Sequence, residues 1–349
     1  MLISNTDNYK NMKNEKIILG HGSGGQLTHE LIHNIFMKHF DNDYLNQAGD
    51  SAIADFAYNK IAVTTDSYVV DPIFFTNGNI GKLAVAGTVN DIAVSGAKPL
   101  YITAAFIIEE GLSLNELEEI VKTMSDEAKK AGVKIISGDT KVVEKGKCDK
   151  IFINTTGVGF FNNNSTYIQN HNEIKPGDKI IINGSIGDHG MAIMAERNQL
   201  NIKAKIESDC ASLNHLIEKI LSQNNDIKFI RDVTRGGLAT VLTEIVENKN
   251  FGIEIDETKI KVKDTVRGIC ELLGFDPMYV ANEGKIVCVV SEKNAENVLK
   301  IMKSDPHGKD AEIIGEIIDS NPGKAWITTN IGGRRILYRL SGEQLPRIC

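Results

Sequence analysis

The sequence lacks the features that direct a chain into or across a membrane. Its N-terminal segment, Met1 to Lys16, is polar and rich in Asn and Lys, without the apolar stretch of a secretory signal. No apolar run approaches the ~20 residues that span a bilayer. Cysteines are few, 5 in 349 residues, with neither CxxC spacing nor a disulfide framework, which is typical of a reducing compartment. We therefore expect a cytoplasmic protein without membrane association.

Several binding signatures are also missing. No GxxxxGKS/T loop occurs and no GxGxxG opens a strand–helix unit, which disfavours a P-loop and a dinucleotide-binding fold. No HExxH motif or Cys/His cluster suggests zinc. The formal charge of -7 argues against nucleic acid as the main partner, because phosphate-backbone binding needs a basic face. It does not exclude ATP, since magnesium supplies positive charge at a nucleotide site.

What is present is the composition of a packed protein. Apolar residues make up 42% and charged residues 24% of the chain, and 349 residues exceed one ordinary core, so two α/β regions are expected. In the first region, alternation at 60–65 predicts a strand that delivers Asp66 at its end. An apolar run at 80–95 predicts a buried helix, and the capping box 113–116 begins a second helix. A strand is expected at 133–137.

The division between the two regions falls at residues 162–175, which are rich in Asn, Ser and His and lack periodicity. A Pro-Gly-Asp turn then leads into a strand at 179–182. We expect four parts along the chain. They are a polar extension at 1–16, an N-terminal domain at 17–161, a C-terminal α/β domain at 175–325, and a strand with a mobile tail at 326–349.

Acidic residues recur at the ends of expected strands or helices, beside glycine or other small residues. They are Asp50, Asp66, Asp91, Asp139 and Asp232. Magnesium prefers carboxylate and water oxygens and is usually shared with substrate phosphates, so carboxylates converging in one cleft would suit it. The alternative is that each Asp caps a turn. Asp91 fits that alternative least, because it interrupts an apolar helix where an unpaired charge is costly.

Two glycine-rich segments are candidates for anion binding. The run Gly22-Ser23-Gly24-Gly25 could wrap a phosphate with backbone N–H groups. The segment 184–190 lies between a strand and a helix, and a tight turn with close helix approach explains it equally well. We interpret the neighbouring His21 and His189 as surface or structural residues. Lys141 and Glu283 are either surface charges or, if one pocket holds both, an acid/base pair.

The sharpest single feature is Cys349, the last residue of the sequence. It has few neighbours to bury it, and prenylation would need the cysteine four residues from the end. Its thiolate would be a nucleophile, and nearby Arg347 would partly offset the terminal carboxylate that opposes ionisation. The segment from Ser341, bendable at Gly342, reaches ~30 Å when extended. The alternative is an incidental cysteine.

Taken together, these motifs resemble the HypE family, the carbamoyl dehydratases of NiFe-hydrogenase maturation. That family lies within the aminoimidazole-ribotide-synthetase and selenophosphate-synthetase superfamily. The likeness covers nearly everything from Ile17 onward. It rests on the segments 21–25, 49–51, 64–67, 89–92, 137–141, 232–237 and 282–285 and on the ending Pro346-Arg-Ile-Cys349. The Asp and Gly segments mark the superfamily, and the ending singles out the family.

The resemblance implies a two-domain α/β (α+β) fold of the aminoimidazole-ribotide-synthetase type. It implies a homodimer whose N-terminal sheets join into a barrel, with the domain at 17–161 serving ATP binding and dimerisation and ATP lying between domains. It also implies partners: a HypF-like carbamoyltransferase that loads Cys349 with a carboxamide, and an iron-holding complex of the HypC/HypD kind that receives cyanide.

Roles for individual residues follow from the same resemblance. The catalytic residues would be Cys349, Lys141 and Glu283. The residues that bind Mg²⁺ would be Asp50, Asp66, Asp91 and Asp232. The residues that contact nucleotide would be Gly22, Ser23, Gly24, Gly25, Asn90, Gly138, Asp139 and Thr140, with Asp139 and Thr140 touching nucleotide or metal.

The implied activity is ATP-dependent dehydration of the carboxamide on Cys349 to a thiocyanate. An amide oxygen is a poor leaving group, and transfer of the γ-phosphoryl group to it makes the leaving group phosphate. One rival is a small-molecule phosphotransferase of the selenophosphate-synthetase kind, whose reactive residue lies near the N-terminus, where this sequence has no cysteine before Cys148. The other is a non-enzymatic, nucleotide-dependent scaffold for a metal, but a lone soft ligand is a poor metal site.

Overall fold

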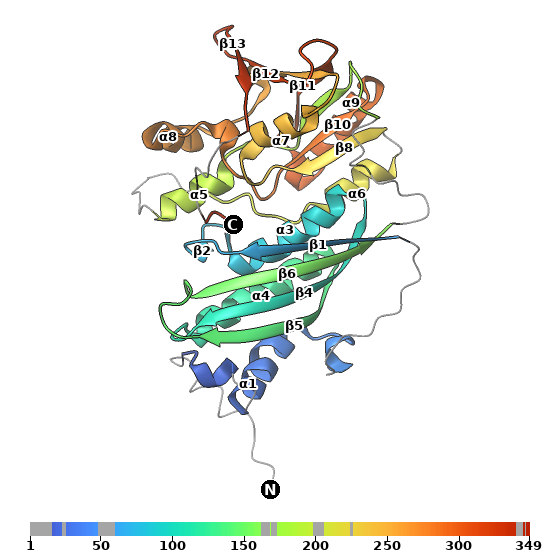
Figure 1. Ribbon diagram of the computed structural model, residues 1–349. Helices are drawn as coiled ribbons and strands as arrows, with labels where there is room; N and C mark the ends of the chain where they lie inside the picture. The colour runs from blue at the N-terminus through green and yellow to red at the C-terminus, as the bar shows by residue number, and fades with distance from the viewer. Residues whose placement is uncertain are drawn as a thin grey trace.

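The computed structural model describes residues 16–22, 26–47, 60–161, 168, 173–197, 206–223, 226–339, 345 and 347–349. They form two α/β units, each built on its own large sheet (Figure 1). Helix α3 (Ile80–Val94) lies between the two sheets. The expected polar extension, apart from Lys16, and most of the expected linker at 162–175 lie outside the described residues.

The sheet of the first unit has four strands in the order β1-β6-β4-β5. Strand β6 pairs antiparallel with β1 and with β4, while β4 pairs parallel with β5 at the far edge. A small hairpin of β2 and β3 follows β1 and leads into α3. The strand bounds are β1 (Ile61–Tyr68), β2 (Phe74–Phe75), β3 (Gly78–Asn79), β4 (Lys98–Glu109), β5 (Lys134–Val143) and β6 (Ile151–Phe160).

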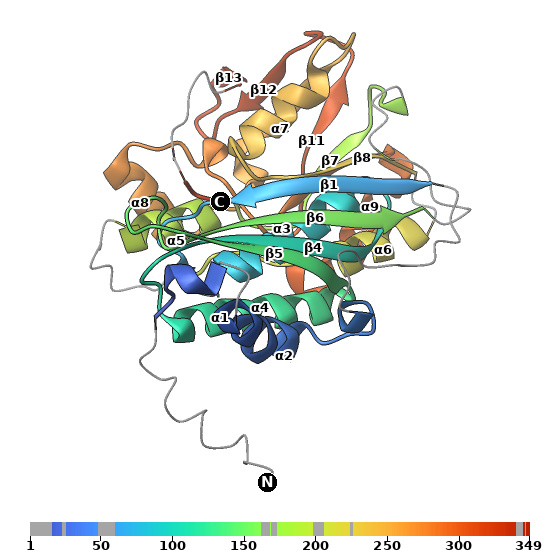
Figure 2. The same cartoon turned by 60° about the horizontal axis from the view of Figure 1, so that its bottom comes forward.

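Two long helices, α3 and α4 (Leu114–Ala131), cover one face of this sheet (Figure 2). The Asn79 side chain caps α3 by accepting two N–H groups of its first turn. Helix α4 begins at the capping box of Ser113 and Glu116 and ends at Gly132 in the left-handed conformation. The expected helix at 80–95 and the expected capping box are thus confirmed. Short helices α1 (Gln26–Leu31), η4 (Ile32–Met37) and α2 (Lys38–Phe40) precede β1.

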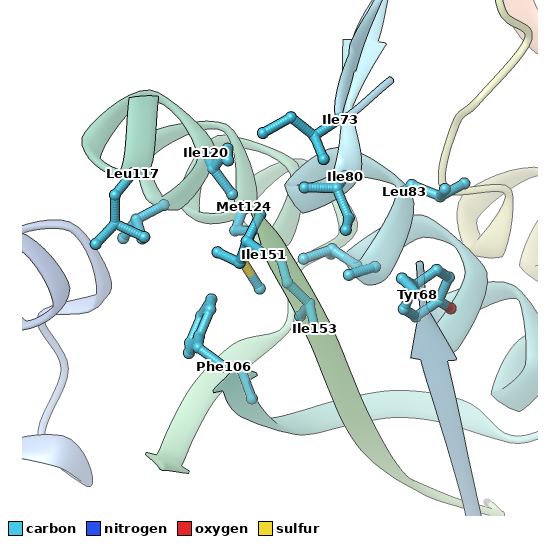
Figure 3. Packing of buried hydrophobic residues seen from close by; sticks show 14 of the residues in the cluster. Tyr68, Ile73, Ile80, Leu83, Phe106, Leu117, Ile120, Met124, Ile151 and Ile153 are labelled. Atoms are coloured by element: carbon cyan, nitrogen blue, oxygen red, sulfur yellow. The ribbon is translucent and has the colours of Figure 1, made fainter. Parts of the chain in front are cut away.

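The core of the first unit lies where α3, α4 and the sheet meet (Figure 3). Its fully buried side chains include Ile80, Leu83, Ile120, Met124 and Ile151. The helices approach closely at Gly81, where an added Cβ would lie 2.5 Å from the carbonyl oxygen of Ile120.

The other face of the first sheet is not covered by any helix among the described residues. It exposes three large apolar side chains: Ile61 is 51%, Val63 59% and Ile107 44% exposed. Apolar side chains clustered on one open sheet face are typical of a surface that meets a partner.

The sheet of the second unit has seven strands in the order β13-β12-β9-β11-β7-β10-β8. All neighbours pair antiparallel except β12 and β9, which are parallel. The strands are β7 (Lys179–Ile182), β8 (Ile227–Asp232), β9 (Gly252–Asp256), β10 (Ile286–Val290), β11 (Glu312–Ile318), β12 (Ala325–Thr328) and β13 (Arg334–Leu337). The helices are α5 (Asp188–Arg197), α6 (Asn214–Ser222), α7 (Gly237–Val246), α8 (Asp264–Leu273) and α9 (Glu292–Lys303).

Two expectations about strands need correction. The strand expected at 133–137 continues to Val143, so Asp139 and Lys141 lie inside an edge strand rather than after its end. Asp66 likewise lies within β1, two residues before its last residue, Tyr68. The strand expected at 179–182 is confirmed. None of the helices in the described part of the chain is long and apolar enough to cross a membrane.

Candidate active site

Three of the predicted metal-binding carboxylates come together where the two units meet. Asp66 lies on β1, Asp91 on α3 and Asp232 at the end of β8. Burial, and then the negative charges of Asp232 and Asp66, raise the pKa of Asp91 to about 8, and a hydrogen bond of 2.8 Å from the Thr64 hydroxyl opposes that rise. Asp91 therefore interrupts an apolar helix because it belongs to a charged group, not because it caps a turn.

Glu283 completes this group from the loop that precedes β10. Its side chain is only 4% exposed, and its Oε1 atom is buried with no hydrogen-bond partner. Burial, followed by the charge of Asp232, raises the pKa of Glu283 well above its ordinary value. A buried carboxyl group with an unpaired oxygen is suited to exchange a proton with a bound substrate.

Asp209, which sequence reasoning missed, fixes the loop that carries Glu283. One carboxylate oxygen accepts the N–H of Glu283 at 3.2 Å. The other accepts the N–H of Gly284 at 3.2 Å and the ammonium of Lys285 at 2.8 Å. Gly284 is required for this approach, since a Cβ there would lie 1.9 Å from the carbonyl oxygen of Asp209. These hydrogen bonds to Asp209 therefore fix the backbone position of Glu283.

Tyr68, also missed, joins the carboxylates to the core. Its hydroxyl lies 3.4 Å from Asp66 Oδ2 and 3.4 Å from the Thr88 hydroxyl. Burial, and then the charge of Asp66, raise the pKa of Tyr68 well above the ordinary value, so the phenol stays protonated. The sequence feature that could have identified Tyr68 is its position as the last inward-facing residue of an alternating strand.

The predicted nucleophile lies at the end of β1. A backbone oxygen of Cys349 accepts the N–H of Val69 at 3.1 Å, and Val69 directly follows Tyr68 in the chain. The half-buried Cys349 packs against the core of the first unit, and the preceding Ile348 is 3% exposed. Figure 1 places the end of the chain between the two units, near β2, α5 and the end of β1, and Figure 2 shows it at the end of β1 near α5.

Lys141 and Asp139 lie elsewhere within one chain. Both are on edge strand β5, where their side chains are 67% and 64% exposed and the Lys141 ammonium is 3.7 Å from the Asp139 carboxylate. Their register partners on β4 are Ile107 and Ala105, so they share the open face of the sheet. Asp66 pairs with the buried Thr155 of β6 and faces α3 instead. A single chain therefore does not bring Lys141 to Glu283.

The remaining predicted nucleotide contacts are of three kinds. The Asn90 amide is used internally: Oδ1 accepts the N–H of Leu213 at 2.7 Å, and Nδ2 donates to the carbonyl oxygen of Ala211 at 3.0 Å. Gly138 and Thr140 lie in β5, and Gly22 ends a short 3₁₀ helix. Ser23, Gly24 and Gly25 lie outside the described residues, as does Asp50, the fourth predicted metal-binding carboxylate.

The second glycine-rich segment is a close-packed turn. The N–H of Gly187 donates to Asn282 Oδ1 at 2.7 Å, and that of Gly190 donates to the carbonyl oxygen of Ala281 at 3.0 Å. A Cβ at Gly190 would lie 2.5 Å from Val280. These N–H groups bond within the protein, which favours the turn over the phosphate site.

The described residues contain no group of three or more His, Cys, Asp or Glu side chains arranged to hold a metal ion. The chemistry of the donors nevertheless suits a hard divalent cation. Asp66, Asp91 and Asp232 offer carboxylate oxygens, and the mutual repulsion that raises the pKa of Asp91 is what a cation would relieve.

Comparison with known families defines the class first. Residues 48–161 match the N-terminal domain, and residues 175–327 the C-terminal domain, of AIR synthase related proteins. The chain is therefore a two-domain protein with a mixed α/β fold of the AIR synthase type.

Closer relatives then give the family. The chain is 45% identical over 340 residues to the carbamoyl dehydratase HypE of Cupriavidus necator, covering 97% of this chain and 96% of that protein. A crystal structure of the hydrogenase maturation protein HypE in complex with ATP matches with a TM-score of 0.90 at 45% identity, covering 95% of this chain and 99% of that one. A HypE–HypF complex matches with a TM-score of 0.76 at 51% identity, covering 89% and 99%. The chain belongs to the HypE family of carbamoyl dehydratases.

Proposed function

We propose that this protein dehydrates a carboxamide carried on the sulfur of Cys349 to a thiocyanate, at the expense of ATP. The thiocyanate would supply a cyanide ligand for the iron of NiFe-hydrogenase. The observation that carries the proposal is the hydrogen bond from the Val69 N–H to Cys349, because Val69 follows Tyr68, whose hydroxyl lies 3.4 Å from Asp66. The ATP complex of a HypE relative supports nucleotide as the second substrate.

The reaction balances without an added oxidant or reductant. The starting group is S–C(=O)–NH₂, and the γ-phosphoryl group of ATP passes to its oxygen, which releases ADP. The C–O bond then breaks with phosphate as the leaving group, and the nitrogen gives up both protons to form C≡N, one to a base and the other to the departing phosphate. Glu283 takes a proton from nitrogen, and Lys141 holds the carboxamide oxygen, although the two roles could be exchanged. Attachment to the chain makes the reaction intramolecular and raises the effective concentration.

Mg²⁺ is the cation that these carboxylates fit, and Asp66, Asp91 and Asp232, with Asp50, would hold it. When bound, the ion neutralises charge on the transferring phosphoryl group. Gly22 to Gly25, Gly138, Asp139 and Thr140 remain our predicted contacts to nucleotide or metal, and Asn90 could contribute only by exchanging a present hydrogen bond.

A second copy of the chain would complete the site. We propose a homodimer in which the open faces of two four-stranded sheets join into a barrel, burying Ile61, Val63 and Ile107. In such a barrel, the exposed side chains of Lys141 and Asp139 would face the second copy of the chain. The two family matches support the proposed domains at 17–161 and 175–325. The proposed last part, 326–349, holds β13 and most of β12, which belong to the sheet of the second unit.

The family resemblance implies two protein partners. A HypF-like carbamoyltransferase would load Cys349, and the HypE–HypF complex among the relatives supports such a contact. An iron-holding complex of the HypC/HypD kind would receive the cyanide.

Mass spectrometry of the loaded protein tests the proposed activity. Carbamoylated protein mixed with Mg²⁺ and ATP should lose the mass of one water from the peptide that contains Cys349. Cys349→Ala should form no product yet still bind ATP. If the carbamoylated protein never loses water, the dehydratase assignment is wrong and the scaffold alternative gains support. Loss of ATP binding in Cys349→Ala would contradict the separation of thiol and nucleotide sites.

A further inference from the structure

Helix α5 holds the C-terminal segment from one side at two points. Near its start, His189 Nε2 lies 2.9 Å from the carbonyl oxygen of Ile348. At its end, Arg197 Nη2 donates to the carbonyl oxygen of Arg347 at 2.8 Å. The same guanidinium donates to the carbonyl oxygen of Asp71 at 2.9 Å from Nε and 2.6 Å from Nη2. One helix thus contacts consecutive carbonyl groups just before Cys349.

The hydrogen-bond partners of His189 define its tautomer. A carbonyl oxygen only accepts, so Nε2 must carry the hydrogen that points at Ile348. Burial lowers the pKa of His189 and favours the neutral ring, so Nδ1 carries no hydrogen and accepts from the Ser208 hydroxyl at 2.8 Å. Phe75 packs edge-on against the ring at 5.5 Å. The buried imidazole is therefore fixed with its donor facing the C-terminal segment.

The segment after β1 holds the C-terminal residues from the other side. The N–H groups of Val69 and Asp71 donate to the carbonyl oxygens of Cys349 and Arg347 at 3.1 and 3.2 Å. Arg347 Nε donates back to the carbonyl oxygen of Val69 at 3.0 Å, and its guanidinium pairs with Asp149. The last residues therefore occupy a slot between α5 and the end of β1.

The slot is not free of strain. Arg347 has a φ of 56°, in the left-handed region that a residue with a side chain rarely adopts. Its Nη2 is buried without a hydrogen-bond partner. Both features offset part of what the hydrogen bonds contribute to the docked segment.

We propose that Arg197 and His189 are positioning residues that dock the C-terminal segment and so place Cys349 beside the carboxylate group. This inference rests on the proposed function. Release from the slot makes the thiol available to the carbamoyltransferase, and docking returns the loaded sulfur to Glu283. The two residues then act on the dehydration step and not on ATP binding, because neither belongs to the carboxylate group or to a predicted nucleotide contact.

Amide hydrogen exchange tests docking without relying on turnover. The Val69 and Asp71 amides should be protected in the full-length protein and should exchange about tenfold faster in Arg197→Gln, since a charged hydrogen bond is lost. Glu196→Gln is the matched control, because Glu196 is next to Arg197 but accepts from Thr76. His189→Gln should give faster exchange at the same amides. Unchanged exchange in both Arg197→Gln and His189→Gln would overturn the proposal, provided circular dichroism shows each is folded.

Single-turnover measurements separate this inference from the proposed function. In Arg197→Gln, dehydration of the carbamoylated protein should slow about tenfold while carbamoyl transfer onto Cys349 and ATP affinity stay at wild-type values. Equal slowing of loading and dehydration would contradict a docking role. If the wild-type protein shows the protected amides but no dehydration, docking of the C-terminal segment is supported and the proposed function is wrong.

Discussion

At the scale of single residues, Asp91 shows how function overrides local preference. An apolar helix gains nothing from a carboxylate, yet α3 directs Asp91 toward Asp66 and Asp232. The sequence identified this residue because a charge in an apolar run needs a reason. It did not identify Tyr68 or Asp209, since a tyrosine in a strand and an aspartate in a loop are ordinary in their local context.

Asp91 also predicts how stability depends on pH in the protein without ligands. Its pKa is about 8 in the folded state and 3.8 ordinarily, so the folded state binds more protons between these values. Stability contributed by protonated Asp91 is therefore present below pH 4 and is lost as the pH rises toward 8. Asp91→Asn should remove this loss, so its free energy of unfolding should exceed that of the wild type by about 5 kcal/mol at pH 8, with little difference at pH 4.

Urea unfolding at several pH values, without nucleotide or Mg²⁺, measures this difference. The same variant should turn over ATP more slowly with Mg²⁺. A constant offset between the two proteins across the pH range would show that the Asp91 carboxyl does not titrate as described.

At the scale of elements, local signals predicted the structure well where they were strong. The capping box at Ser113 and the apolar run of α3 each correspond to a helix in the structure. The sequence predicts a strand only as far as 137, and the residues that follow, Gly138 and Asp139, are of types uncommon in strands. Strand β5 continues because β4 pairs with it as far as Val143. Tertiary pairing therefore decided the environment of Lys141, and sequence periodicity could not reveal it.

The loop before β10 gives a prediction about glycine. Gly284→Ala should cost about 1–3 kcal/mol and displace Glu283, because the new Cβ would meet the Asp209 carbonyl oxygen at 1.9 Å. Gly268→Ala is the matched control. Gly268 lies inside α8 with no atom within 4 Å of an added Cβ, so alanine should stabilise the protein by about 0.5–1 kcal/mol. Thermal unfolding of both variants checks the pair, and equal effects would contradict the described loop.

At the scale of the whole molecule, the site is an assembly that no single segment encodes. Its carboxylates come from β1, α3, β8 and the loop before β10, and Arg197 and His189 reach it from α5. From the sequence, the motifs that carry Asp and Gly could be assigned to one site only through a family resemblance. The structure places Asp66 on one face of the first sheet and Asp139 and Lys141 on the other. This separation depends on strand order and register, which the sequence pattern does not contain.

The open face of the first sheet predicts the oligomeric state. Val63→Lys places a charge among Ile61 and Ile107, and burying it on association would be costly, so the proposed dimer should dissociate into folded monomers. Light scattering after size exclusion measures the mass. Leu272→Lys is the control, since Leu272 is 70% exposed on α8, away from that face, and should leave the dimer intact. A dimer that survives Val63→Lys would place the interface elsewhere.

The Asn90 amide has a consequence for how the two units behave together. Asn90 lies on α3 of the first unit and hydrogen-bonds to two residues of the second unit. Its side-chain oxygen accepts from the N–H of Leu213, and its side-chain nitrogen donates to the carbonyl oxygen of Ala211. Rotation of one unit away from the other would strip both bonds from a buried group. These two hydrogen bonds therefore oppose separation of the two units at this helix.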